Sequence, residues 1–207
     1  FAAPTFWIAQ YGTSACGWSD NNTYPRQVVD VNGDGLPDVV GFSSTGVYIA
    51  LNTGTSFAPA TTWIAQYGTS AGGWSDNNTY PRQLVDVNGD GLPDIVGFAS
   101  GGVQVALNTR TSFGASTVWN TNFGTNSGWS NNNTYPRQIV DVNGDGLLDI
   151  VGFSGTGVYV ALNTGTSFAT GSFWNTNFGL SGGWSDNSTY PRQVVDVNGD
   201  GLPDVVG

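Results

Sequence analysis

The strongest constraint on this chain is a twelve-residue string that occurs four times. The string PRQ(V/L/I)VDVNGDGL begins at Pro25, Pro81, Pro136 and Pro191, so successive copies lie 55 or 56 residues apart. Self-similarity at a fixed period is typical of architectures in which one supersecondary unit is copied along the chain. We therefore divide a single domain, 1–207, into units 1–56, 57–112, 113–167 and a shorter one, 168–207.

Each unit consists of short β-branched runs separated by turn residues, which predicts strands and not helices. In the first complete set we expect strands at 26–30, 38–42, 46–51 and 57–66. Because the loops between the first three are short and rich in glycine, these strands must be antiparallel neighbours. Four-stranded repeats of this length predict the blades of an all-β propeller, and a β-solenoid with its shorter repeats is the alternative.

The phase of the repeat predicts an incomplete ring. The sequence opens on a fourth-strand segment and stops within a second strand, which gives fifteen expected strands and fewer than four blades. A single chain could close as a four-bladed ring, whereas near-identical units also suit a larger ring completed by several copies. We expect the second arrangement, a homo-oligomer, with a dimer as its simplest form.

The composition excludes several classes of function. Asp supplies all 15 acidic residues and Arg all 5 basic ones, the net charge is -10, and His, Lys, Glu and Met are absent. A chain this acidic lacks the basic patch that nucleic acids require. Its apolar runs are also far shorter than the roughly 20 residues that span a bilayer. We therefore expect no nucleic acid partner and no membrane insertion.

Most of the acidic residues fall in four loops that read DVNGDGL(P/L)D. Side-chain oxygens at loop positions 1, 3, 5 and 9, a carbonyl at position 7 and glycines at 4 and 6 match the first half of an EF-hand loop. Oxygen donors without His or Cys favour calcium over zinc, although Asp, Asn and Gly also form turns without a metal. We expect structural calcium, and its candidate ligands are Asp30, Asn32, Asp34, Leu36 and Asp38; Asp86, Asn88, Asp90, Leu92 and Asp94; Asp141, Asn143, Asp145, Leu147 and Asp149; and Asp196, Asn198, Asp200, Leu202 and Asp204.

A second repeated cluster, GWS(D/N)N(N/S)TYPR, lies in the connector between blades, on the face expected to be opposite the acidic hairpins. An exposed aromatic plane beside an arginine suits a sugar ring, which stacks its C–H face and hydrogen-bonds its hydroxyls. Packing between blades is the alternative for the same residues. The candidate carbohydrate-binding residues are Trp18, Tyr24, Arg26, Trp74, Tyr80, Arg82, Trp129, Tyr135, Arg137, Trp184, Tyr190 and Arg192. The tryptophans of the fourth strands, Trp7, Trp63, Trp119 and Trp174, are expected in the core.

The two motifs together resemble known families. The string DVNGDGLPDVVGF followed by GVYIALN resembles the calcium-bearing FG-GAP blades of integrin α-chains. With GGW and YPR ahead of it, the chain resembles the seven-bladed propeller lectins, Psathyrella velutina lectin-like in fungi and Photorhabdus lectin-like in bacteria. This resemblance implies sugar pockets between consecutive blades. It implies N-acetylglucosamine or sialic acid as ligand in the fungal branch and fucose or methylated sugars in the bacterial branch. The YPR motif of this chain is nearer to the bacterial branch.

We therefore expect a multivalent, non-catalytic lectin that binds fucose-type or N-acetylglucosamine-type ends of glycans, secreted or at the cell surface. One alternative is an integrin-like calcium-binding propeller that mediates protein–protein interaction. The least expected alternative is a glycoside hydrolase, because that chemistry needs two carboxylates at one site. Only Asp20, Asp76 and Asp186 lie outside the four loops, one to a connector.

Overall fold

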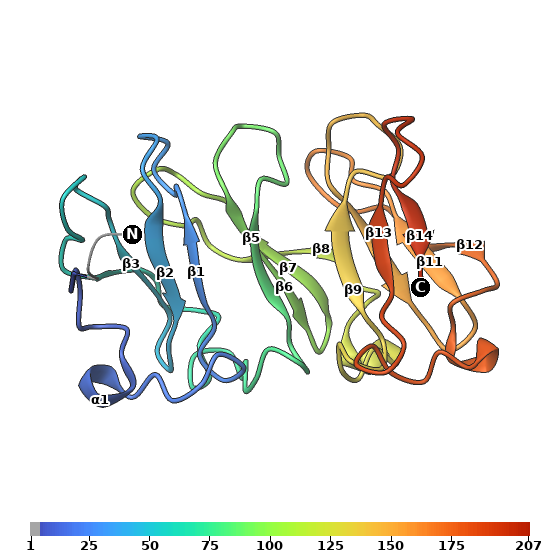
Figure 1. Ribbon diagram of the computed structural model, residues 1–207, viewed down its shortest axis with the longest axis horizontal. Coiled ribbons are helices and arrows are strands. Elements are labelled where there is room, and N and C mark those ends of the chain that lie inside the picture. The colour runs from blue at the N-terminus through green and yellow to red at the C-terminus, as the bar shows by residue number, and fades with distance from the viewer. Residues whose placement is uncertain (1–4) are drawn as a thin grey trace.

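A computed structural model describes residues 5–207, which form fourteen strands in four antiparallel sheets (Figure 1). Strands that follow one another in sequence are also neighbours within a sheet. The first sheet contains β1 (Arg26–Val29), β2 (Asp38–Phe42), β3 (Val47–Ala50) and β4 (Thr61–Ile64); the second contains β5 (Arg82–Val85), β6 (Asp94–Ala99), β7 (Gly102–Ala106) and β8 (Thr117–Asn120); the third contains β9 (Arg137–Val140), β10 (Asp149–Phe153), β11 (Val158–Ala161) and β12 (Ser172–Asn175); and the fourth contains β13 (Gln193–Val195) and β14 (Asp204–Val206).

The sheets stand side by side in an open arc, each one a blade of a partial propeller (Figure 1). The expected all-β fold with four-stranded antiparallel blades is confirmed for the first three blades, and the fourth has two strands in the described part of the chain. The described residues form no closed ring. Completion of the ring by a second copy stays a prediction.

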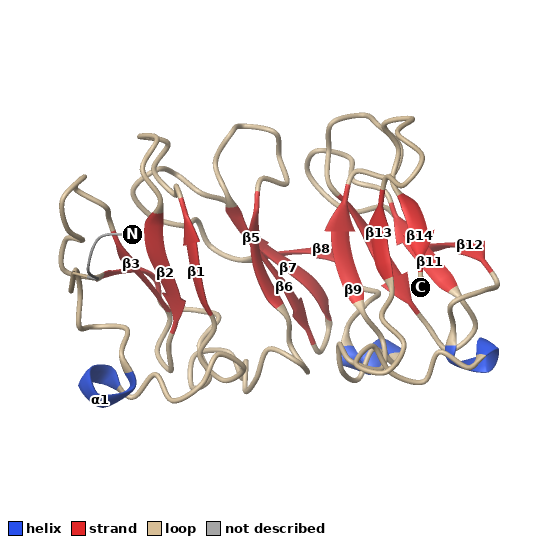
Figure 2. Ribbon diagram, in the orientation of Figure 1, coloured by secondary structure: helices blue, strands red, loops and turns tan. Residues whose placement is uncertain are grey.

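Two details differ from the sequence-based expectation (Figure 2). The fourth-strand segment expected at the start of the chain falls partly on residues 1–4, outside the described residues, and residues 5–8 form no strand because no described strand pairs with them. Three short helical turns also interrupt the connectors, α1 (Thr13–Cys16), η1 (Thr125–Ser127) and η2 (Leu180–Gly182). None of the described helices has the length and apolar character needed to cross a membrane.

Neighbouring blades are joined by an aromatic pair between the fourth strand of one blade and the next blade. Trp63 of β4 lies 5.7 Å from the ring of Phe113 in the second blade, and Trp119 of β8 lies 5.6 Å from Phe168 in the third. Both tryptophans are buried, which confirms their expected place in the core. Trp174 is 52 % exposed because no described ring covers it. Trp7 is 40 % exposed although it contacts Phe57, so these two are not core residues.

A second joint lies near the acidic loops. Asn108 of the second blade donates its side-chain amide to the carbonyl of Val31 in the first blade, at 2.8 Å. Asn163 of the third blade makes the same bond to Val87 of the second, also at 2.8 Å. Both valines are fully buried, so each bond satisfies a carbonyl that water cannot reach. Successive blades are therefore locked in one relative position.

The connector tryptophans form a third joint. The indole of Trp74 lies directly over Gly97 in β6, so that a methyl group on Gly97 would overlap the outer edge of the ring. Gly41 and Gly152 are covered in the same way by Trp18 and Trp129. Glycine is required at this point because it alone leaves room for the ring against the strand.

We predict that Gly97→Ala destabilises the fold by about 1–3 kcal/mol, because the added methyl group overpacks the indole of Trp74. Chemical denaturation followed by tryptophan fluorescence measures the change. Gly101→Ala is the matched control, since a methyl group there meets open space and its backbone needs no left-handed conformation. Equal stability of the two variants would contradict the packing role of Gly97.

Candidate functional site

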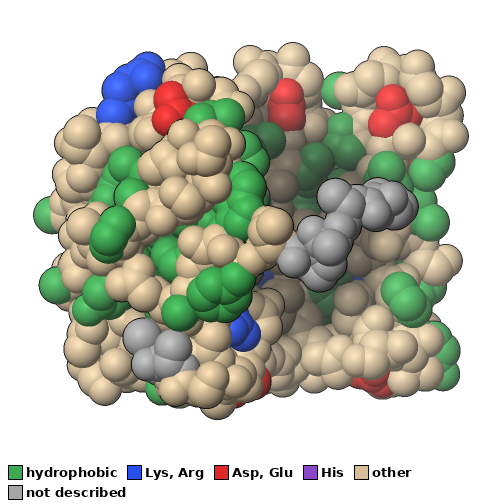
Figure 3. All heavy atoms as spheres, turned by 60° about the vertical axis from the view of Figure 1, so that its left-hand side comes forward, with side chains coloured by type: hydrophobic (Ala, Val, Ile, Leu, Met, Phe, Trp, Pro, Cys, Tyr) green, Lys and Arg blue, Asp and Glu red, His purple; other side chains and the backbone are tan. Residues whose placement is uncertain are grey.

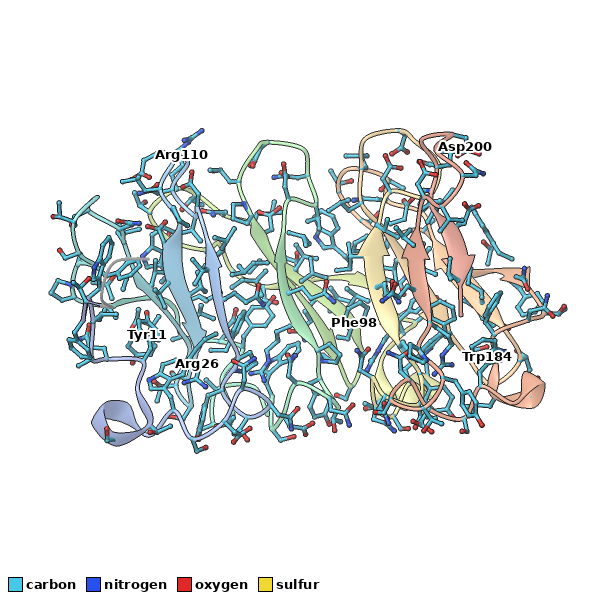
Figure 4. The ribbon with its side chains drawn as sticks, in the orientation of Figure 1. Tyr11, Arg26, Phe98, Arg110, Trp184 and Asp200 are labelled. Atoms are coloured by element: carbon cyan, nitrogen blue, oxygen red, sulfur yellow. The ribbon has the colours of Figure 1, made fainter. Side chains whose placement is uncertain are left out.

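The two sequence motifs lie at opposite rims of the arc (Figure 4). Asp200 of an acidic loop and Arg110 lie at the upper rim of this view, and Arg26 and Trp184 of the connectors lie toward the lower rim. The space-filling view shows acidic side chains in separate groups along the upper rim (Figure 3). The expected placement of the connectors opposite the hairpins is correct, so the two motifs form separate sites.

Each acidic loop is held closed by its own backbone. In the first loop, Asp30 accepts hydrogen bonds from the amides of Gly33 at 2.7 Å and Gly35 at 2.8 Å. Asn32 donates its side-chain amide to Asp34, whose other oxygen accepts the amide of Leu36. Burial raises the pKa of Asp30, but the hydrogen bonds from the amides of Gly35, Gly33 and the two residues beside them outweigh it, so the pKa is lowered. The loop is an Asx-type turn whose carboxylates are already hydrogen-bonded.

The ninth loop position has a different role from the others. Asp94 is fully buried at the start of β6, and its two oxygens accept the amides of Val87 at 3.1 Å and Asn108 at 2.7 Å. Asp38 and Asp149 make the equivalent pairs of bonds. Burial raises the pKa of Asp94 to about 6. These three carboxylates tie the hairpin to the end of the third strand.

The donor types in the acidic loops favour calcium, whereas the arrangement of their side chains in the described part of the chain does not form a metal site. Carboxylate, amide and carbonyl oxygens are the donors that calcium prefers. However, no group of three acidic side chains converges as a metal site within residues 5–207. The loop carboxylates instead face backbone amides. Calcium therefore stays a prediction, and Asp30, Asn32, Asp34 and the Leu36 carbonyl are the donors that could reach an ion in the first loop.

Three of the four connector arginines, Arg82, Arg137 and Arg192, are buried and do not present their guanidinium groups to solvent. Arg137 is 1 % exposed, donates to the carbonyl of Phe123 at 3.0 Å and lies over the ring of Phe98 in the preceding blade at 5.1 Å. Burial lowers the pKa of Arg137 to about 9. Arg82 and Arg192 stack in the same way on Phe42 and Phe153, and Arg26 is partly exposed. Arg82, Arg137 and Arg192 thus fill the junctions between blades, as in the packing alternative that the sequence left open.

The connector tryptophans are also buried, with ring faces that are not free for stacking. Trp18, Trp74 and Trp129 are 5 %, 4 % and 7 % exposed, while Trp184 is partly buried. Tyr24, Tyr80 and Tyr135 are half-buried and contact the tryptophan edges, and Tyr190 is exposed. The exposed aromatic plane expected from the sequence is therefore wrong for these tryptophans. Their edges nevertheless line two clefts.

The two clefts lie between a connector and the turn joining the second and third strands of the following blade. The cleft at the first blade has a volume of about 260 Å³ and that at the third about 430 Å³. The first is lined by Gln10, Tyr11, Trp18, Ser43, Ser44, Thr45, Tyr48 and Ala60, and the third by Asn122, Phe123, Ser127, Gly128, Trp129, Tyr135, Ser154, Gly155, Thr156, Tyr159 and Gly171.

Each cleft combines an aromatic wall with hydroxyl groups. In the first, the Thr45 hydroxyl lies 3.1 Å from the Tyr48 hydroxyl, and Ser43 lies 3.5 Å from Thr45. In the third, Ser154 and Thr156 are 3.3 Å apart beside Tyr159. Tyr48 and Tyr159 sit where the register between the third and fourth strands shifts. Such bulges redirect side chains at strand edges. Our sequence analysis missed these turn and third-strand residues, and their variation among the repeats was the available signal.

A separate hollow, distinct from the two clefts, lies between the connectors. The asparagines of successive connectors are linked from blade to blade: the amides of Asn77 and Asn78 donate to Asn22, and those of Asn132 and Asn133 donate to Asn78. A hollow of about 410 Å³ is lined only by Asn21, Asn22, Asn77, Asn78, Asn132, Asn133 and Asn187. These bonds hold neighbouring connectors together and thereby fix the walls of the clefts.

Comparisons with known proteins agree with this architecture. The family described as FG-GAP repeat matches residues 83–119, and the FG-GAP-like repeat family matches residues 141–207. A solved structure of an Agrocybe aegerita lectin, described as specifically recognising non-reducing terminal N-acetylglucosamine, aligns with a TM-score of 0.91 and 39 % identity. The alignment covers 98 % of this chain and 50 % of the lectin chain, so this chain spans about half of that length.

More distant structures share the fold alone. The Tc holotoxin pore of Photorhabdus luminescens aligns with a TM-score of 0.60 at 22 % identity, over 87 % of this chain and 8 % of the toxin chain. A TcdB2-TccC3 structure aligns at 0.51 and 18 % identity, over 77 % of this chain and 7 % of the other. The search of curated protein sequences gives no significant match. The resemblance to β-propeller lectins with FG-GAP-type repeats is thus confirmed.

We predict that Arg137→Ala destabilises the fold by about 2 kcal/mol, because it removes charged hydrogen bonds and the stacking on Phe98. Urea denaturation measures the change. Arg110→Ala is the matched control: the side chain of Arg110 is exposed and donates to the Asn32 carbonyl at 3.2 Å, and its loss should cost less than about 0.5 kcal/mol. A neutral effect of Arg137→Ala would contradict its role as a blade joint.

Proposed function

We propose that this chain is a carbohydrate-binding propeller protein that recognises non-reducing terminal N-acetylglucosamine. The observation that carries the proposal is the pair of clefts in which a tyrosine ring stands beside a cluster of hydroxyls. A tyrosine ring can stack on the C–H face of a sugar, and serine and threonine hydroxyls can exchange hydrogen bonds with its hydroxyls. The similarity to an N-acetylglucosamine-specific lectin supports this sugar over fucose.

The proposed function is non-catalytic. The acids outside the loops are one to a connector, and the third connector has Asn131 in that place. Asp76 accepts hydrogen bonds from the Ser75 hydroxyl at 2.8 Å and the Thr79 amide at 2.8 Å, so its carboxylate shapes the connector. Two carboxylates flanking one bond are what glycoside hydrolysis requires. Repeated sites on one rim instead favour avidity for glycan arrays outside the cell, where we expect the protein to act.

We predict that the double variant Tyr48→Ala, Tyr159→Ala weakens binding to immobilised N-acetylglucosamine at least about tenfold, which corresponds to ~1.4 kcal/mol. The reason is loss of the ring on which the sugar stacks in both clefts. Affinity on a glycan-coated surface, with free N-acetylglucosamine and free fucose as competitors, measures the effect. Thr111→Ala, an exposed change in the loop before β8, is the control. Unchanged binding by the double variant would contradict the site.

We also propose that calcium strengthens the acidic hairpins, with Asp30, Asn32, Asp34 and the Leu36 carbonyl as donors in the first loop. The support is the donor chemistry and the concentration of negative charge, since three carboxylates per loop repel one another without a cation. Any site with calcium at 100 times its dissociation constant would add about 2.7 kcal/mol to the free energy of unfolding.

We predict that the chain melts several degrees higher in calcium than in chelator, and that magnesium gives a smaller rise because the loop donors do not impose octahedral geometry. Differential scanning calorimetry measures the shift. The triple variant Asp34→Asn, Asp90→Asn, Asp145→Asn should lose most of the calcium effect. Identical melting of the native chain in calcium and in chelator would contradict calcium binding while leaving the sugar clefts untouched.

A further inference from the structure

The three complete blades share one hydrogen bond, from a backbone amide before the fourth strand to a side-chain amide oxygen of the connector. The amide of Ala60 donates to the side-chain carbonyl of Gln10 at 2.7 Å in the first blade. In the second blade the amide of Ser116 makes the same bond to Gln66 at 3.1 Å. In the third, Gly171 bonds Asn122 at 3.4 Å. Differences among the three sites therefore come from the side chains placed around this shared bond.

In the second blade those side chains bond to one another. The Ser116 hydroxyl lies 2.7 Å from the Tyr67 hydroxyl and donates to the Gln104 amide oxygen at 3.3 Å. Tyr67 is fully buried, whereas Tyr11, its counterpart in the first blade, is 9 % exposed. The position of Ser116 is taken by Ala60 and Gly171 in the other blades, neither of which carries a hydroxyl.

The second blade also lacks the groups that make the other clefts suitable for a sugar. Gln104 stands where Tyr48 and Tyr159 provide aromatic rings. In its turn, Ala99 and Gly101 stand where the first blade has Ser43 and Thr45 and the third has Ser154 and Thr156. The tyrosine ring and the hydroxyls at these two turn positions are thus missing, and the Ser116 hydroxyl is bonded to Tyr67 and Gln104 within the protein.

We infer that the clefts are not equivalent: the first and third blades bind sugar, and the second is closed by the Tyr67–Ser116–Gln104 hydrogen-bond chain. This inference rests on the proposed function and adds which blades carry it. Gln104, Ser116 and Gly101 are the residues that determine the difference. The binding sites along this arc are therefore two blades apart, which sets the spacing of glycan ends that one chain can engage together.

The test is an NMR titration of the native chain with N-acetylglucosamine, observing the indole N–H signals, because Trp18 and Trp129 line the two open clefts. The signals are assigned with single Trp→Phe variants. We expect those of Trp18 and Trp129 to shift and that of Trp74, in the second connector, to stay unchanged. A saturable shift of Trp74 in the native chain would overturn the inference.

Two reciprocal variants make the test sharper. The variant Gly101→Thr, Gln104→Tyr, Ser116→Ala should open the second cleft, and Trp74 should then shift on titration; a side chain at position 101 meets open space. The variant Thr45→Gly, Tyr48→Gln, Ala60→Ser should close the first cleft and abolish the shift of Trp18 while that of Trp129 remains. Circular dichroism verifies folding of both.

The outcomes separate the two claims. If the native chain binds but neither folded variant changes which indoles shift, the inference about Gly101, Gln104 and Ser116 is wrong and the lectin function stands. If a variant fails to fold, the reciprocal one decides. If no indole shifts with N-acetylglucosamine and the native chain also fails to bind immobilised sugar, the proposed function fails and the inference fails with it.

Discussion

Adjacent blades of this protein bury apolar side chains against each other, and the rest of the structure depends on these junctions. Arg137 over Phe98, Trp119 against Phe168 and the Asn163 amide on the Val87 carbonyl all cross one junction. A four-stranded sheet this small cannot bury enough surface by itself, so the stability of each blade depends on these contacts. The clefts also depend on these contacts. One wall of each cleft comes from a connector, and the other comes from the turn between the second and third strands of the blade that follows it.

The two repeated motifs lie at opposite rims of the arc and have different roles. The acidic hairpins, closed by glycine amides and anchored by buried carboxylates such as Asp94, stiffen one rim. The clefts occupy the opposite rim, with Tyr48 and Tyr159 redirected by shifts in strand register. Calcium affinity and sugar affinity are therefore expected to be separable properties. A change in an acidic loop should reach the clefts only through the stability of the blades.

The repeat predicted the strands well because β-branched runs separated by short glycine-rich turns are compatible only with antiparallel hairpins. The expected strand 38–42, for example, coincides with β2. The repeat could not predict which way connector side chains point. Trp74 and Arg82 have the composition of a sugar site, yet both are buried, because a glycine at position 97 admits the indole and Phe42 receives the guanidinium. The sequence did not indicate Thr45 and Thr156 as binding residues, because turns of that composition are common. Only the packed structure brings them beside Tyr48 and Tyr159.

The most direct test of this account is a crystal structure of the chain with N-acetylglucosamine. The account predicts sugar density in the cleft beside Thr45 and Tyr48 and in that beside Thr156 and Tyr159, with Arg137 still buried against the preceding blade. Sugar bound instead in the asparagine-lined hollow between the connectors, or on the acidic rim, would contradict it.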